Sequence, residues 1–291
     1  MVRLCPRLPG DQEWNARIGI ISRQPHTRPG HKYATRAVAT WAAVWKADRF
    51  VSTMADMSTA KELHVTAAGA YEHVLNDLAP VFGRDAGIPI RLTVANAAGV
   101  IKRLEAKEPA DVVLTSAAGI AHLVAAGLAD ASTQTQIGRV GLGVAVYPGL
   151  PLPDLSTAAS VRVALLSATR VAFIDPTGGG TSGPFIAKLF ERLGIDRQMN
   201  ESGVLSKTGK DVVRTVTSGE ATLGLTQATE LIGAKGVQFA GYLAPEVQVV
   251  SVYSAAVSTF AEAPDAARSF ISFLKSPAGS ERFAHAGWDA T

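Results

Sequence analysis

The segment DPTGGGTSGPFIAKLFERLGI, residues 175–195, carries the most informative pattern in the chain. It follows the apolar run RVAFI, residues 170–174, and Gly178, Gly180 and Gly183 satisfy the spacing G-x-G-x-x-G. That spacing is typical of a dinucleotide site when it joins a strand to a helix. The segment therefore raises the question of whether these glycines approach a nucleotide or another anion.

The residues that follow disfavour a nucleotide. A dinucleotide-binding fold needs an acidic residue at the end of the next strand, about twenty residues on, but the weak strand GVLS, residues 203–206, ends at Lys207. Pro184 stands where an uninterrupted helix start would bind pyrophosphate, and no Gly-Lys-Ser/Thr triplet is present for a P-loop. Two alternatives remain. Either free N–H groups at the helix start hold a small anion, or the glycines form a turn without a ligand.

Outward from this segment, hydrophobic periodicity predicts strands that alternate with helices. The expected strands are residues 62–69, 88–95, 110–117, 138–149, 170–175 and 247–257, with a short strand and turn in 222–233. The expected helices are residues 70–87, 96–110, 118–129, 182–195, 209–221 and 264–287. Such alternation predicts parallel strands covered by helices on both faces.

Two of these alternating sets are joined by strand-like crossings near residues 138–146 and 246–255. This arrangement predicts two lobes with a hinge. We expect the first lobe to comprise residues 61–139 plus 253–291 and the second to comprise residues 140–252.

The first sixty residues differ from the rest. Residues 1–50 hold nine Lys/Arg and three Asp/Glu, so the net charge of +3 comes from this part and a nucleic-acid surface is disfavoured. Their apolar run, residues 37–45, closes on charged residues and makes no convincing signal peptide. We expect residues 1–60 to be a disordered leader, with Met54 or Met57 as an alternative start. Cys5, the single cysteine, also lies there.

Six segments in order resemble the type II periplasmic solute-binding proteins of the molybdate-binding class, a family that includes aconitate isomerase-like members. They are VTAAGAYEHVLNDLAPVF, RLEAKEPADVVLTSA, GRVGLGVAVYPG, DPTGGGTSGPFIAKLFERLGI, VTSGEATLGLTQATEL and AARSFISFLKSPAGSERFAHAGW. The resemblance implies an α/β fold of two lobes with a hinge and an interlobe cleft. It implies a monomer that captures a small anion for an ABC importer, in the periplasm; a cytoplasmic location is the alternative.

The resemblance also implies where the ligand is held: in loops after the strands and at helix starts. The residues at the matching positions are Gly69, Ala70, Tyr71, Asn96, Ala97, Ser116, Gly180, Thr181 and Ser182, with Gln227 at a strand edge as a further candidate. Arg139 is added because it precedes the crossing strand, where its side chain could reach the cleft. Molybdate binders carry serines in the first two loops, where this chain has Gly69-Ala70 and Asn96-Ala97. We therefore expect an organic di- or tricarboxylate rather than molybdate.

Several candidates have a second interpretation. The guanidinium of Arg139 could grip a carboxylate with two parallel bonds, or it could be a solvated side chain. Thr181 and Ser182 could donate to a ligand or cap a helix, and Tyr71 could close the pocket or lie in the core. Lys207 and Lys210 flank a glycine turn toward the second lobe, whereas Lys102 and Arg103 have the spacing of surface charges.

Metal and catalytic constellations are not evident in the sequence. His64, His73 and His122 lack ligand spacing, so we expect no metal and no cofactor. No catalytic residue can be assigned. An isomerase acting on a tricarboxylate would need one base to take an allylic proton, and Glu230 and His64 are the residues that could supply it.

Overall fold

The computed structural model describes residues 62–289. The leader predicted over residues 1–60, the alternative starts Met54 and Met57, and Cys5 lie outside the described residues. Within the described part, no helix has the length and apolar character needed to cross a membrane.

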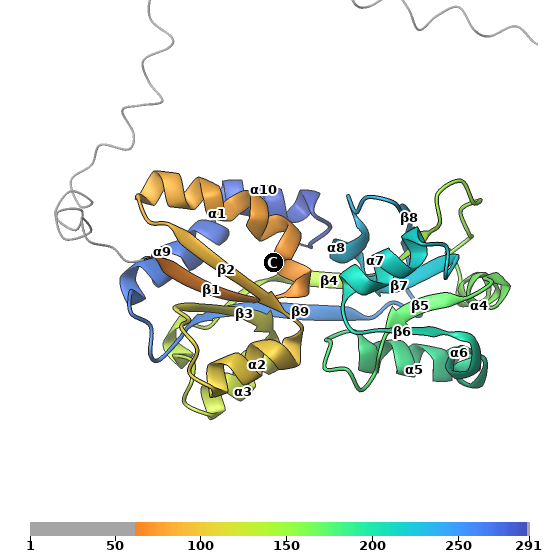
Figure 1. The fold of residues 1–291 in the computed structure, drawn as a ribbon, viewed down its shortest axis with the longest axis horizontal. Coiled ribbons are helices and arrows are strands. Elements are labelled where there is room, and N and C mark those ends of the chain that lie inside the picture. The colour runs from red at the N-terminus through yellow and green to blue at the C-terminus, as the bar shows by residue number, and fades with distance from the viewer. Residues whose placement is uncertain (1–61, 290–291) are drawn as a thin grey trace, which may run out of the picture. The chain divides into compact units, whose positions relative to one another are not determined.

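Hydrogen-bonded strands form a single path in the order β2-β1-β3-β9-β4-β7-β5-β6, and β8 pairs with β4 (Figure 1). The strands are β1 Leu63–Ala68, β2 Ile90–Ala95, β3 Val112–Ser116, β4 Thr135–Val146, β5 Val171–Ile174, β6 Val204–Ser206, β7 Leu223–Gln227, β8 Gln238–Tyr242 and β9 Val250–Val257. The helices are α1 Glu72–Ala86, α2 Ala97–Glu105, α3 Ala117–Ala125, α4 Ala158–Ser167, α5 Gly183–Leu193, α6 Asp196–Ser202, α7 Gly209–Thr217, α8 Ala228–Leu231, α9 Pro264–Leu274 and α10 Pro277–His285, with short 3-10 turns at Gly69–Tyr71 and Ala131–Thr133.

Lobe 1 consists of β1–β3, β9, α1–α3, α9 and α10, which enclose one buried hydrophobic cluster. Strand β1 is parallel to β2 and β3, and β9 is antiparallel to β3. Helices α1, α9 and α10 contact one another on one face of the strands, and α2 and α3 lie together on the other (Figure 1). The face of α1 predicted from spacing, which includes Val74, Leu78 and Phe82, is buried in this cluster. The predicted parallel strands with helical cover are therefore present here.

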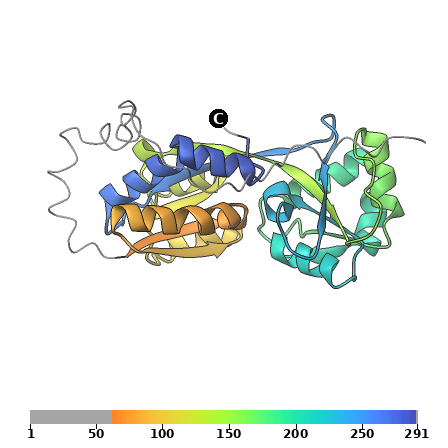
Figure 2. The ribbon, with the colours of Figure 1, turned by 90° about the horizontal axis from the view of Figure 1, so that it is seen from above.

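Lobe 2 consists of β5–β8 and α4–α8 and encloses a second hydrophobic cluster. Strand β5 is parallel to β6 and β7. Strand β4 connects the two lobes, because its first half pairs with β9 and its second half, from Leu142, pairs with β7 and β8. Figure 2 shows the long β4 and β9 strands passing between the two groups of helices. The two-lobe α/β fold predicted from the sequence is confirmed.

Local differences from the sequence-based expectation have local causes. The final helix is divided into α9 and α10, because Pro277 disfavours a helical conformation at the preceding residue, Ser276, which instead caps α10. Helix α4 was not predicted, because AASVRVALLS shows weak amphipathic spacing; its start is fixed by a reciprocal capping pair between Thr157 and Ser160. Helix α6 and strand β8 were also not predicted.

Candidate functional site

A cavity of about 790 Å³ lies between the two lobes, among the ends of strands and the starts of helices. Its lining includes Ala68, Gly69, Ala70, Glu72, His73, Asn76, Asn96, Ala97, Ile174, Gly180, Thr181, Ser182, Lys207, Thr208, Gly209, Lys210, Arg214, Gln227, Thr229, Glu230, Lys235 and Tyr253. Backbone N–H groups at helix starts have no partner within the helix, and the helix dipole is positive there. The position of the cavity thus suits an anion.

The glycine-rich turn of residues 178–183 contacts the opposite lobe. The Asn96 side-chain amide donates to the carbonyl of Gly178 at 2.9 Å, and the Ala98 N–H donates to the carbonyl of Gly179 at 3.0 Å. Gly179 has φ +78°, and a Cβ there would lie 2.5 Å from Cβ of Ala98. The turn therefore places the carbonyls of Gly178 and Gly179 at the start of α2, where they form hydrogen bonds between the lobes.

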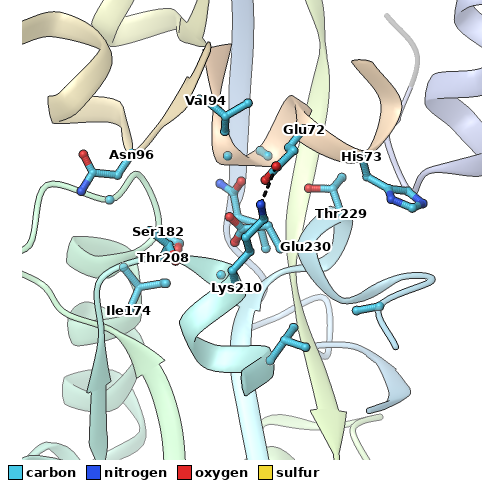
Figure 3. Close-up of a pocket in the computed structure, with 18 of the residues that line it drawn as sticks. Glu72, His73, Val94, Asn96, Ile174, Ser182, Thr208, Lys210, Thr229 and Glu230 are labelled. Carbon is cyan, nitrogen blue, oxygen red and sulfur yellow. Dashed lines mark hydrogen bonds and ion pairs between the residues drawn. The ribbon is translucent and has the colours of Figure 1, made fainter. Parts of the chain in front are cut away.

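The start of α5 contributes the next part of the lining. Gly180, Thr181 and Ser182 all face the cavity, as the resemblance implied. Ser182 is almost fully buried, and its side chain makes no capping bond to α5. Figure 3 shows Ser182 beside Ile174 on one side of the cavity. The capping interpretation of Ser182 is thus not realised, and its hydroxyl lies in the cavity wall.

Gln227, at the end of β7, also lines the cavity as implied. Its Oε1 accepts a hydrogen bond from the hydroxyl of Tyr253, while its Nε2 is buried without a hydrogen-bond partner among the described residues. Thr229 Oγ1 is also buried without a hydrogen-bond partner among the described residues. Burial raises the pKa of the Tyr253 hydroxyl, so that it remains a protonated donor. An orphan buried donor in a cavity wall is a group that a ligand could satisfy.

Glu230 contributes a carboxylate to the cavity lining. The Thr226 hydroxyl donates to its Oε2 at 2.6 Å. Burial raises the pKa of Glu230, an effect opposed by hydrogen bonds from Thr226 and from the backbone N–H groups of Gly209 and Gln227, and reinforced by Glu72. A Cβ on Gly209 would lie 2.2 Å from the Glu230 carboxyl carbon, and one on Gly69 would lie 3.1 Å from its Oε1. The Glu230 carboxylate therefore fills space that is available because Gly69 in lobe 1 and Gly209 in lobe 2 have no side chains.

An ion pair spans the cavity. Nζ of Lys210, in the first turn of α7, lies 2.6 Å from Oε1 of Glu72, in the first turn of α1. Figure 3 shows this pair between Asn96 on one side and His73 on the other. Lys210 is a cation at a helix start, where the dipole disfavours it, so its position depends on nearby anions.

Three of the expected ligand residues lie outside the cavity lining. Tyr71 is fully buried, donates to the backbone carbonyl of Ser254 and packs against Trp288, which corrects the expectation that it closes the pocket. Ser116 caps α3 by accepting from the Gly119 N–H. Arg139 is exposed on β4, and its backbone pairs with Asp289, so the guanidinium does not reach the cleft as expected. The cavity lining includes none of the three because core packing, capping and strand alternation direct these side chains elsewhere.

The remaining polar candidates divide in the same way. Lys207 and Lys210 line the cavity, whereas Lys102 and Arg103 do not, and Arg103 pairs with Glu108. His73 lines the cavity, but His64 and His122 do not. Within residues 62–289, no group of three or more His, Cys, Asp or Glu side chains could hold a metal ion.

Sequence reasoning missed several cavity residues, among them Glu72, Arg214, Lys235 and Tyr253. Tyr253 is the most deeply buried of these four. It lies within the apolar strand β9 and is 1% exposed, so its pattern is that of a core residue. Strand β9 passes under the cavity at the junction of the lobes, where the Tyr253 hydroxyl meets Gln227. The one available signal was its place in the predicted crossing.

Comparison with known proteins agrees with this architecture. The model of a family described as bacterial extracellular solute-binding protein matches residues 63–289. The chain belongs to this family. A solute-binding protein of this kind is consistent with a small anionic ligand in the interlobe cavity.

Individual relatives of this solute-binding protein differ in what their names state. An aconitate isomerase from a Pseudomonas species is 28% identical over 220 residues, which is 74% of this chain and 82% of that protein. The periplasmic molybdate-binding protein of Azotobacter vinelandii superposes with a TM-score of 0.69 at 19% identity, covering 79% of this chain and all of that one. PEB3 with bound L-phospholactate superposes with a TM-score of 0.63 at 14% identity, with the same coverage. At these identities the two structures establish the fold.

Proposed function

We propose that this protein captures a small organic polycarboxylate in the interlobe cavity and delivers it to an ABC importer from outside the cytoplasmic membrane. The observation that carries the proposal is the charge of the lining. Lys207, Lys210, Arg214 and Lys235 line the cavity together with the carboxylates of Glu72 and Glu230. Lys210 is paired with Glu72, and Arg214 is paired with Asp211 outside the lining, so Lys207 and Lys235 are the cations that a ligand can neutralise. Two such cations in one cavity favour a ligand with more than one negative charge.

The dimensions of the cavity support an organic ligand over a tetrahedral oxyanion. Ligand pockets for organic molecules are about 300–1,000 Å³, and this cavity of about 790 Å³ falls within that range. A five-atom oxyanion such as molybdate would leave most of this volume to water. The first two loops also present Ala70 and Ala97 to the cavity instead of serine hydroxyls. Both features favour a multi-atom carboxylate.

A thermal-shift panel tests the proposal. The panel comprises citrate, the aconitates, smaller dicarboxylates, molybdate, tungstate and sulfate. A ligand at a hundred times its dissociation constant stabilises the folded state by about 2.7 kcal/mol, which raises Tm by several degrees. We expect such a shift with at least one polycarboxylate and a smaller one with molybdate. A shift with molybdate alone would refute the carboxylate proposal.

Variants locate the bound ligand. Lys207→Met removes a cavity cation, and we expect it to weaken polycarboxylate binding by about tenfold or more, the scale of a lost hydrogen bond to a charged group. Arg139→Met removes an equal charge at an exposed position outside the cavity lining. It should leave the affinity within about twofold, because exposed charges at a distance are screened by salt. Equal losses in both variants would contradict binding in this cavity.

An isomerase acting on an unsaturated polycarboxylate is the second candidate function. It is favoured by the aconitate isomerase relative and by Glu230, a cavity carboxylate whose pKa is raised by burial. In this reaction the Glu230 carboxylate takes an allylic proton and returns it at the other end of the three-carbon unit. The double bond moves, and the base regains its charge. A raised pKa suits a general base that works near neutral pH.

Turnover separates the two candidates. The protein is incubated with cis- and trans-aconitate separately, and interconversion is followed by proton NMR. Binding without interconversion supports the transport function. Interconversion in the wild type that is lost in Glu230→Gln would establish the isomerase instead.

A further inference from the structure

Two groups in the cavity have opposite and unmet hydrogen-bonding capacity. An ionised Glu230 can only accept hydrogen bonds, at about four lone-pair sites on its two oxygens. The Thr226 hydroxyl uses one of these sites, on Oε2, and the backbone N–H groups of Gly209 and Gln227 face the carboxylate as well. The Gln227 Nε2 amide can only donate, and it has no partner among the described residues.

These two groups are joined by a third. The Tyr253 hydroxyl donates to Oε1 of Gln227, which fixes the carboxamide with its NH₂ group as the free end. The Glu230 carboxylate is near enough to Tyr253 to act on its hydroxyl electrostatically. All three side chains line the same cavity. Glu230 and Gln227 thus present an acceptor and a donor to one region of the lining.

The position of the Glu230 carboxylate depends on two neighbouring residues that lack side chains. A Cβ at residue 209 would overlap the carboxylate, 2.2 Å from its carbon, and a Cβ at residue 69 would be in tight contact with it, 3.1 Å from Oε1; both residues are glycine. One glycine comes from each lobe, so the carboxylate lies where the lobes meet. A second anion placed directly against it would be repelled, because like charges at close range destabilise each other.

We propose that Glu230 and Gln227 together recognise a hydroxyl group, and that the cavity selects hydroxycarboxylates over carboxylates of the same size that lack the hydroxyl. A hydroxyl both donates and accepts, so it can donate to the Glu230 carboxylate and accept from Gln227 Nε2. The cationic side chains hold the carboxylates of the ligand. This inference rests on the proposed binding of polycarboxylates and adds the ligand subclass and the residues that choose it.

Matched ligand pairs test the selection. Calorimetry compares malate with succinate and citrate with tricarballylate, since each pair differs by one hydroxyl. A site that hydrogen-bonds a hydroxyl discriminates strongly against the analogue without it, because its own polar groups are left unpaired. We expect at least one hydroxylated ligand to bind wild-type protein about tenfold or more tightly than its partner.

Variants at the two residues should reduce the preference for the hydroxylated ligand. In Glu230→Gln, the hydroxylated ligand loses a hydrogen bond to a charged group, while the ligand without hydroxyl is relieved of a like charge. The preference should therefore fall to within about threefold. Gln227→Met removes the donor without changing charge and should also reduce the preference. Glu201→Gln removes one carboxylate at an exposed position on α6, outside the cavity lining, and should preserve it.

The outcomes separate this inference from the proposed function. If wild-type protein binds none of the carboxylates, both are overturned. If it binds carboxylates with equal affinity whether or not they carry a hydroxyl, the proposed function stands and the inference is overturned. A preference that persists unchanged in both Glu230→Gln and Gln227→Met also overturns it.

Discussion

Glu230 illustrates at the scale of one residue how burial couples a side chain to pH. Burial raises its pKa above the ordinary value of 4.5, although Thr226 and two backbone N–H groups partly compensate. The folded protein therefore holds this proton more tightly than the unfolded chain does. The contribution of Glu230 to the free energy of unfolding is fully present below its ordinary pKa. This contribution is lost as the pH rises through the raised pKa of the folded state.

Replacing Glu230 with Gln removes this titration. We expect the Tm of Glu230→Gln minus that of the wild type to become more positive as the pH rises from about 4 toward neutrality, by an amount on the order of a few degrees. Thermal unfolding of both proteins across this pH range measures the difference. A difference that stays constant with pH would contradict the raised pKa.

Two tyrosines show at the same scale what sequence could and could not assign. Tyr71 was implied as a ligand residue by its place in the first loop, but it packs between Tyr253, Phe283 and Trp288 in the core of lobe 1. Tyr253, in an apolar strand, presents its hydroxyl to the cavity. Hydrophobic spacing predicts that both are buried. It carries no information on which hydroxyl meets the cleft.

At the scale of elements, the contact between the glycine turn and the start of α2 holds the lobes together. The Ala98 N–H and the Asn96 amide donate to consecutive carbonyls of the turn, at Gly179 and Gly178. This contact requires a residue without a side chain at position 179, because the space is filled by Ala98 and φ is +78°. We therefore expect this interlobe contact, and ligand binding between the lobes, to depend on Gly179.

Gly179→Ala should weaken ligand binding by about fivefold or more, because strain at a positive φ and overpacking each cost on the order of 1 kcal/mol or more. Gly194→Ala is the matched control: Gly194 ends α5 with φ +62°, and a Cβ there meets nothing within 4 Å. Both variants should lose stability from the positive φ, and only Gly179→Ala should lose affinity. Calorimetry with the best ligand of the panel measures this. Equal affinities in the two variants would show that the turn is not needed for ligand binding.

At the scale of the whole molecule, two hydrophobic clusters are joined by crossing strands, and one side chain bridges these strands where they leave lobe 1. Oε1 of Gln248 accepts from the N–H groups of Leu142 and Val249, and its Nε2 donates to the carbonyl of Leu142. The carboxamide thus adds hydrogen bonds between β4 and the segment before β9. We infer that it limits the directions in which the lobes can move.

Gln248→Ala should lower the free energy of unfolding by about 1–3 kcal/mol, because the Val249 N–H loses its partner and the N–H and carbonyl of Leu142 keep only longer bonds, to Val249 and from Leu243. Gln238→Ala, at an exposed position at the start of β8, should change it by less than about 0.5 kcal/mol. Urea denaturation of the three proteins provides the comparison. If Gln248→Ala is as stable as Gln238→Ala, the bridge does not stabilise the crossing.

The amino-acid sequence by itself determined the local structure: the alternation of strands and helices, the apolar face of α1, the glycine turn before α5 and the crossings that divide the chain into two lobes. These features depend on neighbours within a few turns of chain, which a pattern records. The resemblance to solute-binding proteins, which the sequence also carries, implied Gly180, Thr181, Ser182 and Gln227 as ligand residues, and these residues line the cavity. Only the tertiary structure decided that Arg139 faces solvent and that the Glu230 carboxylate lies against Gly69 and Gly209. Those positions depend on contacts between residues far apart in the chain, whose side-chain directions are fixed when the two lobes pack together.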